Sequence, residues 1–147
     1  FKEIIMANPG PASSTQTHPQ VLSSNQALRL LGSAQSINCN ATGDTAIPIL
    51  NTSSYIILYV IATNASISLT TAAGGLFTGT AAGGTPLVTS AALSALTSST
   101  VASQRTVLAA GAAQNTSQTI YWNIATAQGA AATMDLLVYG IDLTFLP

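Results

Sequence analysis

The stretch Ser54–Gly79, SYIILYVIATNASISLTTAAGGLFTG, decides how the rest of the sequence is interpreted. Residues 55–62 form an unbroken apolar run rich in Ile, Val and Tyr, which predicts a strand buried on both faces and is too short to cross a bilayer. Residues 66–70 alternate between polar and apolar side chains, the pattern of a half-buried strand. Asn64 marks a corner between the two, and Gly74-Gly75 predicts a turn. The stretch therefore indicates the middle of an antiparallel sheet.

Further strand patterns recur through the chain at spacings of roughly 8–15 residues. Pro48 lies inside one of them and predicts an edge strand, because proline has no N–H to donate to a neighbouring strand. Residues 133–146 form the longest predicted strand, in which Gly140 marks a bulge or a close approach. The side chains of this strand that are expected to face inward are Leu137, Tyr139, Ile141, Leu143 and Phe145.

These patterns predict an all-β fold, a jelly-roll-like antiparallel β-sandwich or barrel with at most one short helix. The single helical candidate is residues 90–97, where apolar side chains recur at helical spacing. Residues 1–31 are predicted to form an extended N-terminal arm rich in Pro, Ser, Thr and Gln, and residues 32–147 a single β-sandwich domain. The string MANPG beginning at Met6 is typical of a natural start, so residues 1–5 are interpreted as translated upstream sequence.

The composition is poor in charge and favours an assembly subunit. Charged residues make up 5% of the 147 residues, against roughly 25% in ordinary globular domains, and the formal net charge is −1. This balance offers no basic surface, so neither nucleic acid nor an acidic membrane is an expected partner. A surface of Ser, Thr, Asn, Gln and Ala carries little repulsion between copies, which suits a subunit of an assembly better than a free monomer.

The sequence carries no arrangement of residues typical of an enzyme. His18, the only histidine, lies in the proline-rich arm, and the single Cys39 alternates with Ile37 as a small core residue would. Asp135 and Asp142 are seven residues apart, which places them on opposite faces of one strand and excludes a general acid–base pair. We therefore expect no catalytic residues, no metal and no cofactor.

Aromatic side chains on a β scaffold can stack on sugars, so they must be weighed as a binding site. Trp122 shares the apolar face of its predicted strand, which favours a place in the core. Tyr55, Tyr59 and Tyr121 stay open as surface or interface residues.

Four strings between Gly43 and Gly140 carry a family resemblance: GDTAIPI, TNASISLTTAAGG, GGTPLV and YWNIATAQGAAATMDLLVYG. They resemble the small decoration, or cement, proteins of tailed-bacteriophage heads. The resemblance implies a homotrimer of jelly-roll or similar β domains, made in the bacterial host cytoplasm and bound to the outer capsid surface where major capsid protein subunits meet. It also implies that the N-terminal arm reaches along the shell or into a neighbouring subunit.

For a protein of this kind, the base of the arm is the first candidate interface. Leu28, Leu30 and Leu31 form an apolar patch there, and Arg29 and Arg105 are candidates to pair with capsid carboxylates. A trimer would also bury edge strands that otherwise invite aggregation of a protein with little charge.

Two other classes stay open. The first is a head-fibre or tail-associated domain that binds a receptor or glycan, which would require exposed aromatic side chains around a groove. The second is a pilin-like subunit, which shares the Ala, Thr, Gly and Asn content but is disfavoured by the lack of a second cysteine and of a signal sequence.

Overall fold

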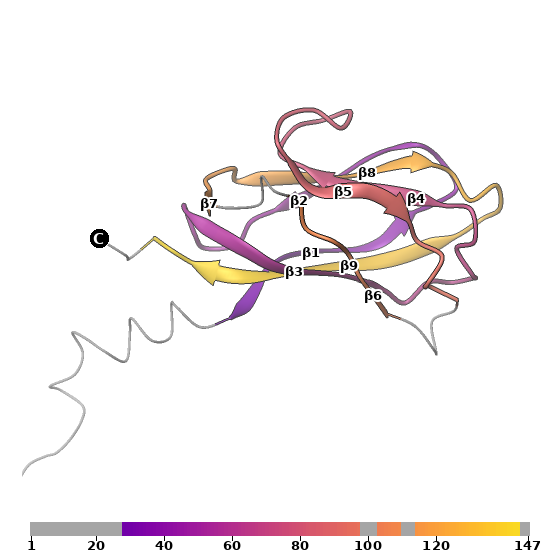
Figure 1. The fold of residues 1–147 in the computed structure, drawn as a ribbon, viewed down its shortest axis with the longest axis horizontal. Helices are drawn as coiled ribbons and strands as arrows, with labels where there is room; N and C mark the ends of the chain where they lie inside the picture. Colours follow the sequence, from indigo (N-terminus) through magenta and orange to yellow (C-terminus); the bar gives the residue numbers. More distant parts are fainter. Residues whose placement is uncertain (1–27, 98–102, 110–113, 145–147) are drawn as a thin grey trace, which may run out of the picture.

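The computed structural model describes residues 28–97, 103–109 and 114–144 (Figure 1). Within these ranges the chain forms nine strands and no helix. The predicted arm up to residue 27 lies outside the described residues. The strands are β1 (Arg29–Asn38), β2 (Gly43–Pro48), β3 (Tyr55–Thr63), β4 (Ala73–Phe77), β5 (Pro86–Ala92), β6 (Ser103–Arg105), β7 (Gln114–Asn115), β8 (Thr119–Thr126) and β9 (Thr133–Asp142).

The strands form two antiparallel sheets that pack face to face (Figure 1). The first sheet has the order β1-β9-β3-β6. β6 pairs with residues 61–63 of β3, and β7 pairs with residues 55–56 on the same edge of that strand. The second sheet has the order β2-β8-β4-β5. Pro48 ends β2, an edge strand of the second sheet, so the predicted edge position of this proline is confirmed.

The strand pairs are nested along the chain, with outer strands pairing with each other and inner strands pairing between them, and this order identifies the sheet topology. The first strand pairs with the last, β2 with β8, β3 with β6 and β7, and β4 with β5. If β6 and β7 are counted as two pieces of one interrupted strand, eight strands form two four-stranded sheets. A hairpin-like ribbon rolled up in this way is a jelly roll, so the predicted fold class is confirmed.

The hydrophobic core lies between the two sheets. It consists of the side chains that point inward at alternate positions of the strands. Trp122, between Ile120 and Ile124 in β8, is fully buried, so the prediction that it packs in the core is confirmed. Cys39 is also buried, as predicted. Tyr55, which the sequence left open as a surface residue, is fully buried too, and its hydroxyl donates to the Ser117 carbonyl at 2.7 Å. Burial of each large apolar side chain contributes about 1.5–3 kcal/mol to folding.

The inward face predicted for residues 133–146 is wrong. In β9 the buried residues are Met134, Leu136 and Val138, together with Gly140 and Asp142. Alternate positions are apolar on both faces of this strand, so the pattern of residues alone fits either orientation. The residues that were expected to face inward and are instead half-buried on the opposite side are Leu137, Tyr139, Ile141 and Leu143, whereas Phe145 lies outside the described residues.

Gly140 lies at a close approach, as predicted. A Cβ at this position would meet the carbonyl of Ile56 on β3 and the side chain of Leu31 on β1. The pairing of β3 with β9 shifts register between Ile57 and Tyr59, next to this contact. Gly140 therefore allows β1, β9 and β3 to pack closely in the centre of the sheet.

Three local predictions are corrected. Residues 90–97 form no helix: β5 extends to Ala92, and the chain then turns so that Leu96 N–H donates to the Leu93 carbonyl at 2.9 Å. Both leucines are buried, and a short turn buries the same spacing of apolar side chains as a helix would. Residues 66–70 form an irregular connection instead of a half-buried strand, because their backbone bonds reach different segments, with Ser66 donating to Thr133 and Leu69 to Leu96.

The third correction concerns Gly74 and Gly75, which lie inside β4 and not in a turn. A Cβ on Gly74 would stand 2.8 Å from Trp122 Cζ2, and one on Gly75 would stand 2.8 Å from the Val88 carbonyl oxygen. The glycines are therefore required by close packing in the sheet and not by a reversal of the chain.

Candidate functional surface

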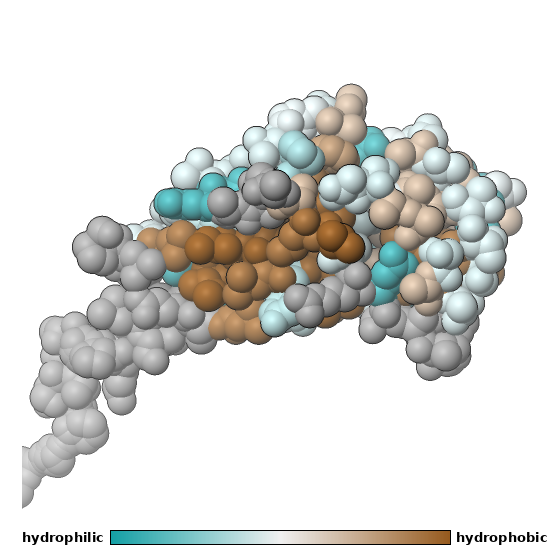
Figure 2. All heavy atoms as spheres, viewed as in Figure 1, coloured by the Kyte–Doolittle hydropathy of each residue, from teal (hydrophilic) through white to brown (hydrophobic). Residues whose placement is uncertain are grey.

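The outer side of the first sheet is apolar. Along β3 and β9, buried residues alternate with half-buried residues that point away from the core, and Figure 2 shows apolar side chains gathered over these two strands. Leu30 on β1 pairs with Tyr139 on the same side of the sheet. We call this surface the outer apolar face, defined by Leu28, Leu30, Ile56, Tyr59, Ile61, Leu137, Tyr139 and Ile141.

The centre of the outer apolar face is a row of side chains across three strands. Tyr139 of β9 lies directly opposite Leu30 of β1 on one side and Tyr59 of β3 on the other. Cross-strand neighbours on one face have Cβ atoms about 4.5–5.5 Å apart, so the two tyrosines are in contact range. A shallow hollow of about 430 Å³ is lined by Leu28, Tyr59, Ile61 and Tyr139.

The outer side of the second sheet is polar by comparison. Asp44 of β2 lies opposite Asn123 of β8, and its Oδ1 accepts a hydrogen bond from Asn123 Nδ2 at 2.7 Å. Asp44 Oδ2 accepts from the backbone N–H of Ala81 at 2.7 Å, which anchors the glycine-rich loop between β4 and β5. The two faces of the sandwich therefore differ in chemistry, and the apolar one is the stronger candidate for a contact with another protein.

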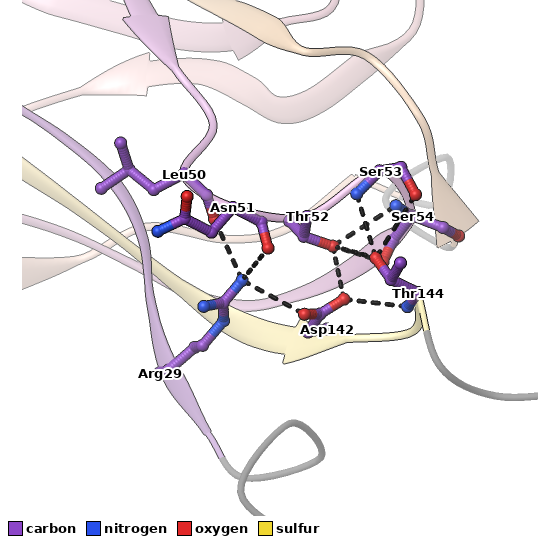
Figure 3. A network of polar contacts seen from close by, with 8 residues as sticks. All are labelled: Arg29, Leu50, Asn51, Thr52, Ser53, Ser54, Asp142 and Thr144. Atoms are coloured by element: carbon purple, nitrogen blue, oxygen red, sulfur yellow. Dashed lines mark hydrogen bonds and ion pairs between the residues drawn. The ribbon is translucent and has the colours of Figure 1, made fainter. Parts of the chain in front are cut away.

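A buried carboxylate lies at one end of the first sheet (Figure 3). Asp142 is 2% exposed, and its Oδ1 accepts hydrogen bonds from Thr52 Oγ1 at 2.5 Å and from the Thr144 backbone N–H at 2.8 Å. Its Oδ2 lies 3.3 Å from Arg29 Nη2. Burial alone would raise the pKa of Asp142, but the hydrogen bonds from Thr144 and Thr52 and the positive charge of Arg29 lower it below its usual value.

The same network joins three separate segments. Arg29 Nη2 also donates to the carbonyl oxygens of Leu50 at 3.0 Å and Asn51 at 3.2 Å. Thr52 Oγ1, which donates its hydrogen to Asp142, accepts a hydrogen bond from the Ser54 backbone N–H at 3.3 Å. The start of β1, the connection between β2 and β3, and the end of β9 are therefore held together at one end of the first sheet (Figure 3).

The structure separates the predicted interface residues. Leu28 is 51% exposed and Leu30 is 36% exposed, and both belong to the outer apolar face. Leu31 is fully buried, so its prediction as an interface residue is wrong: β1 already begins at Arg29, and Leu31 faces the core. β1 begins at Arg29, three residues before the start of the predicted domain at 32–147, and the predicted arm at 1–31 lies mostly outside the described residues.

The two predicted interface arginines also differ. Arg29 forms an ion pair with Asp142 of its own chain, so its guanidinium stabilises the folded domain. Arg105 lies in β6 opposite Ile61, but its side chain lies outside the described part of the structure.

The described residues contain no cluster of three or more His, Cys, Asp or Glu side chains that could hold a metal ion. Asp135 and Asp142 lie on opposite faces of β9, as predicted, and His18 lies outside the described residues. None of the described segments is a helix of sufficient length and hydrophobicity to span a membrane.

Three residues of this surface differ from the sequence-based prediction. The sequence predicts that Ile61 lies in a strand buried on both faces and that Leu137 and Tyr139 face inward, although all three contribute to the outer apolar face. The sequence does contain a sign of this surface, because residues 55–62 and the last strand are apolar at successive positions. A strand of a two-layer sandwich buries only one of its faces between the sheets, so the other apolar face must lie outside.

No protein-family model, curated protein or solved structure matches this chain. The jelly-roll architecture by itself does not assign a function, because viral capsid domains, lectins and cupins all use it. The features of this molecule that bear on function are therefore the outer apolar face and the polar network around Asp142.

Proposed function

We propose that this protein is a structural virion protein that decorates and stabilises the capsid of a tailed bacteriophage. It binds on the outer capsid surface at junctions of the major capsid protein and acts as a homotrimer. The observation that carries the proposal is the outer apolar face, where Leu30, Tyr59 and Tyr139 form an uncharged row across three strands of a jelly-roll domain.

The physical argument begins from the cost of leaving such a face in water. Buried apolar area contributes about 25 cal/mol per Å², so a contact of a few hundred Å² supplies several kcal/mol before the costs of association. Each copy on a closed shell then adds a modest contact, and many copies held on one lattice gain from avidity. Because only 5% of the residues are charged, there is little electrostatic repulsion between neighbouring copies of the chain.

The network around Asp142 supports the same role. It holds the start of β1 in place, so Leu28 and Leu30 are presented from a rigid part of the sheet. A contact surface that is already ordered before binding loses less conformational entropy on association. The resemblance of the strings between Gly43 and Gly140 to decoration proteins agrees with this interpretation.

The first test of the proposal is the native mass of the full chain, measured by size-exclusion chromatography with light scattering. A trimer is expected. Ile61→Lys, which places a charge on the outer apolar face, should weaken the trimer, whereas Ala46→Lys on the exposed side of the second sheet should leave it intact. Chemical denaturation of both variants separates loss of association from loss of folding. A wild-type monomer at all accessible concentrations would remove the homotrimer from the proposal.

The second test measures binding to capsids. The chain should co-sediment with DNA-free shells assembled from the major capsid protein encoded in the same genome, and Ile61→Lys should reduce the bound fraction while Ala46→Lys does not. Full binding by Ile61→Lys would exclude the outer apolar face as the capsid contact. Absence of binding by the wild type would contradict the capsid role.

A second candidate function rests on the two tyrosines. Tyr59 and Tyr139 lie side by side in the hollow, and adjacent aromatic rings on an exposed sheet can stack on the apolar face of a sugar. A receptor- or glycan-binding domain of a head fibre or tail is therefore the alternative. Binding of the chain to a glycan array that is lost in Tyr139→Ala would favour this alternative over capsid decoration.

A further inference from the structure

An open polar hollow lies on the outer side of the second sheet, against the loop between β4 and β5. Its volume is about 470 Å³, and its lining includes Thr42, Asp44, Ala81, Asn123 and Ala125. Figure 1 shows this loop projecting from the second sheet on the side away from the first sheet. The polar hollow and the outer apolar face therefore lie on opposite sides of the sandwich, so a partner bound to one does not cover the other.

The carboxylate of Asp44 is held in one orientation at the polar hollow. Its Oδ1 accepts a hydrogen bond from Asn123 Nδ2 and its Oδ2 accepts one from the Ala81 backbone N–H, both at 2.7 Å. An ionised carboxylate offers about four acceptor positions, so each oxygen retains capacity for a further hydrogen bond. Asn123 brings a second amide N–H and an amide oxygen, and exposed Thr42 brings a hydroxyl. Donors and acceptors are therefore placed side by side before any ligand binds.

The rim of the polar hollow contains a turn in a conformation that alanine rarely adopts. Ala81 and Ala82 have φ values of 54° and 59°, and the Gly83 N–H donates to the Thr80 carbonyl at 2.9 Å. Turns with two central residues of positive φ usually carry Asn, Asp or Gly there. The hydrogen bond to Asp44 holds this strained turn against the sheet, and backbone strain of this kind concentrates at binding sites.

We propose that the polar hollow binds a neutral saccharide. Hydroxyl groups on adjacent carbons of a sugar ring both donate and accept hydrogen bonds, which matches the carboxylate of Asp44 beside the amide of Asn123. The C–H groups of the ring match the methyl groups of Ala81 and Ala125. A few fixed polar groups beside apolar ones are typical of small-molecule sites, and the volume of the hollow suits one or two sugar units.

The charge of the polar hollow favours a neutral sugar over an acidic one. None of the described residues that line it is basic, so an anionic sugar would be repelled by Asp44 without a cation to offset the repulsion. A metal ion is a poorer match, because Ca²⁺ takes six to eight oxygen ligands and Asp44 is the one carboxylate among these lining residues.

This inference goes beyond the proposed function and does not depend on it. A copy whose outer apolar face lies on a shell would present the polar hollow to the surroundings, where a saccharide can reach it. The alternative saccharide contact at Tyr59 and Tyr139 lies on the first sheet, so single substitutions distinguish the two sites.

The first experiment measures binding of the full chain to an array of neutral and sialylated oligosaccharides. Neutral glycans are expected to bind better, and one that binds is then titrated to obtain Kd. Asp44→Asn should raise Kd about tenfold or more, because hydrogen bonds to a charged group are lost. The matched control is Asp135→Asn on β9, whose carboxylate also accepts from one backbone N–H, that of Ser36, and one side-chain amide, that of Asn64. This control should leave Kd unchanged.

A second variant tests the polar hollow without altering the carboxylate or the turn. Ala125 is exposed, so Ala125→Leu should fold normally while its larger side chain occupies the space of the ligand, and Kd should again rise about tenfold or more. Ala91→Leu, at an exposed position of β5 outside the lining, is the matched control and should bind as the wild type does. Chemical denaturation of every variant verifies that it is folded.

Three results would overturn the proposal. The first is absence of binding to every neutral glycan, and the second is tighter binding to sialylated glycans than to neutral ones. The third is a Kd that changes neither in Asp44→Asn nor in Ala125→Leu; if Tyr139→Ala then loses binding, the saccharide lies on the outer apolar face instead. Because these measurements use the isolated chain, failure to bind capsids would not affect them, and their failure would leave the capsid proposal standing.

Discussion

Gly74 of β4 lies directly against the indole ring of Trp122 on β8: a Cβ at position 74 would stand 2.8 Å from Trp122 Cζ2. Trp122, the largest fully buried side chain, therefore fits in the core because Gly74 beside it has no side chain. This pair explains a glycine in the middle of a strand, where glycine is otherwise unfavourable.

Gly74→Ala should destabilise the domain by about 1–3 kcal/mol, because the added methyl group overpacks the core against the indole ring. The measurement is the free energy of unfolding from urea denaturation. The control is Ala91→Ser, an exposed position on β5 directly opposite Gly74, which should change stability by less than about 0.5 kcal/mol. Equal effects of the two substitutions would show that the indole ring moves aside at no cost.

Trp122→Ala should cost about 3–5 kcal/mol, because it leaves a large cavity in a fully buried position. Trp122→Phe should cost clearly less. Among the residues that the structure describes, the buried indole Nε1 has no hydrogen-bond partner, so Phe removes volume but breaks no hydrogen bond there. Urea denaturation followed by circular dichroism measures both variants. A loss below about 1 kcal/mol for Trp122→Ala would be incompatible with a core position.

Acid should weaken the fold through Asp142. The folded state holds the pKa of this carboxyl below its unfolded value, so ionised Asp142 stabilises the protein at any pH above the unfolded pKa of about 3.9. That contribution is lost as the pH falls from there through the folded pKa, since protonation ends the ion pair with Arg29. Unfolding free energy measured between about pH 7 and pH 2 should therefore fall at the acid end.

Asp142→Asn is the comparison for this acid branch. The variant should be less stable at neutral pH and should show a flatter decline below about pH 4. An acid branch as steep in Asp142→Asn as in the wild type would assign the pH dependence to other groups.

Thr52→Val should destabilise the domain by about 1–3 kcal/mol, because the substitution keeps the shape of the side chain but removes the hydroxyl that donates to buried Asp142. Thr52→Ser retains the hydroxyl and should lose less. The unfolding free energy of the two variants at pH 7 provides the measurement. If the Ser variant lost as much as the Val variant, packing of the methyl group and not the hydrogen bond would be responsible.

Asn64→Ala should cost about 1–3 kcal/mol, for two separable reasons. Asn64 has a φ of 55°, a conformation that Asn adopts more readily than Ala, and its Nδ2 donates to Asp135 Oδ2 at 2.8 Å. Asn64→Gly keeps access to the positive φ and loses only the hydrogen bond, so it should be the milder substitution. Equal losses in the urea midpoints of the two variants would show that the backbone conformation contributes nothing.

The sequence alone determined the class of fold. Short apolar runs, turn residues at regular spacing and the lack of long helical patterns indicate a β-sandwich, and Pro48 marks an edge strand because its missing N–H is a local property. Trp122 could also be assigned to the core, since its strand alternates between clearly apolar and more polar positions.

Only the tertiary structure decided which side of β9 faces the core, and hence where the candidate surface lies. Both faces of that strand are apolar, so its residues alone do not give its orientation. Asp142 can lie on the inward side because Arg29 and Thr52, from segments about a hundred residues away, pair with its buried carboxylate. The position of Gly74 under Trp122 likewise depends on the pairing of β4 with β8. Contacts of this kind join residues distant in sequence, and no local pattern encodes them. For that reason Tyr139 and Ile61, which a local interpretation assigns to the interior, form part of the outer apolar face.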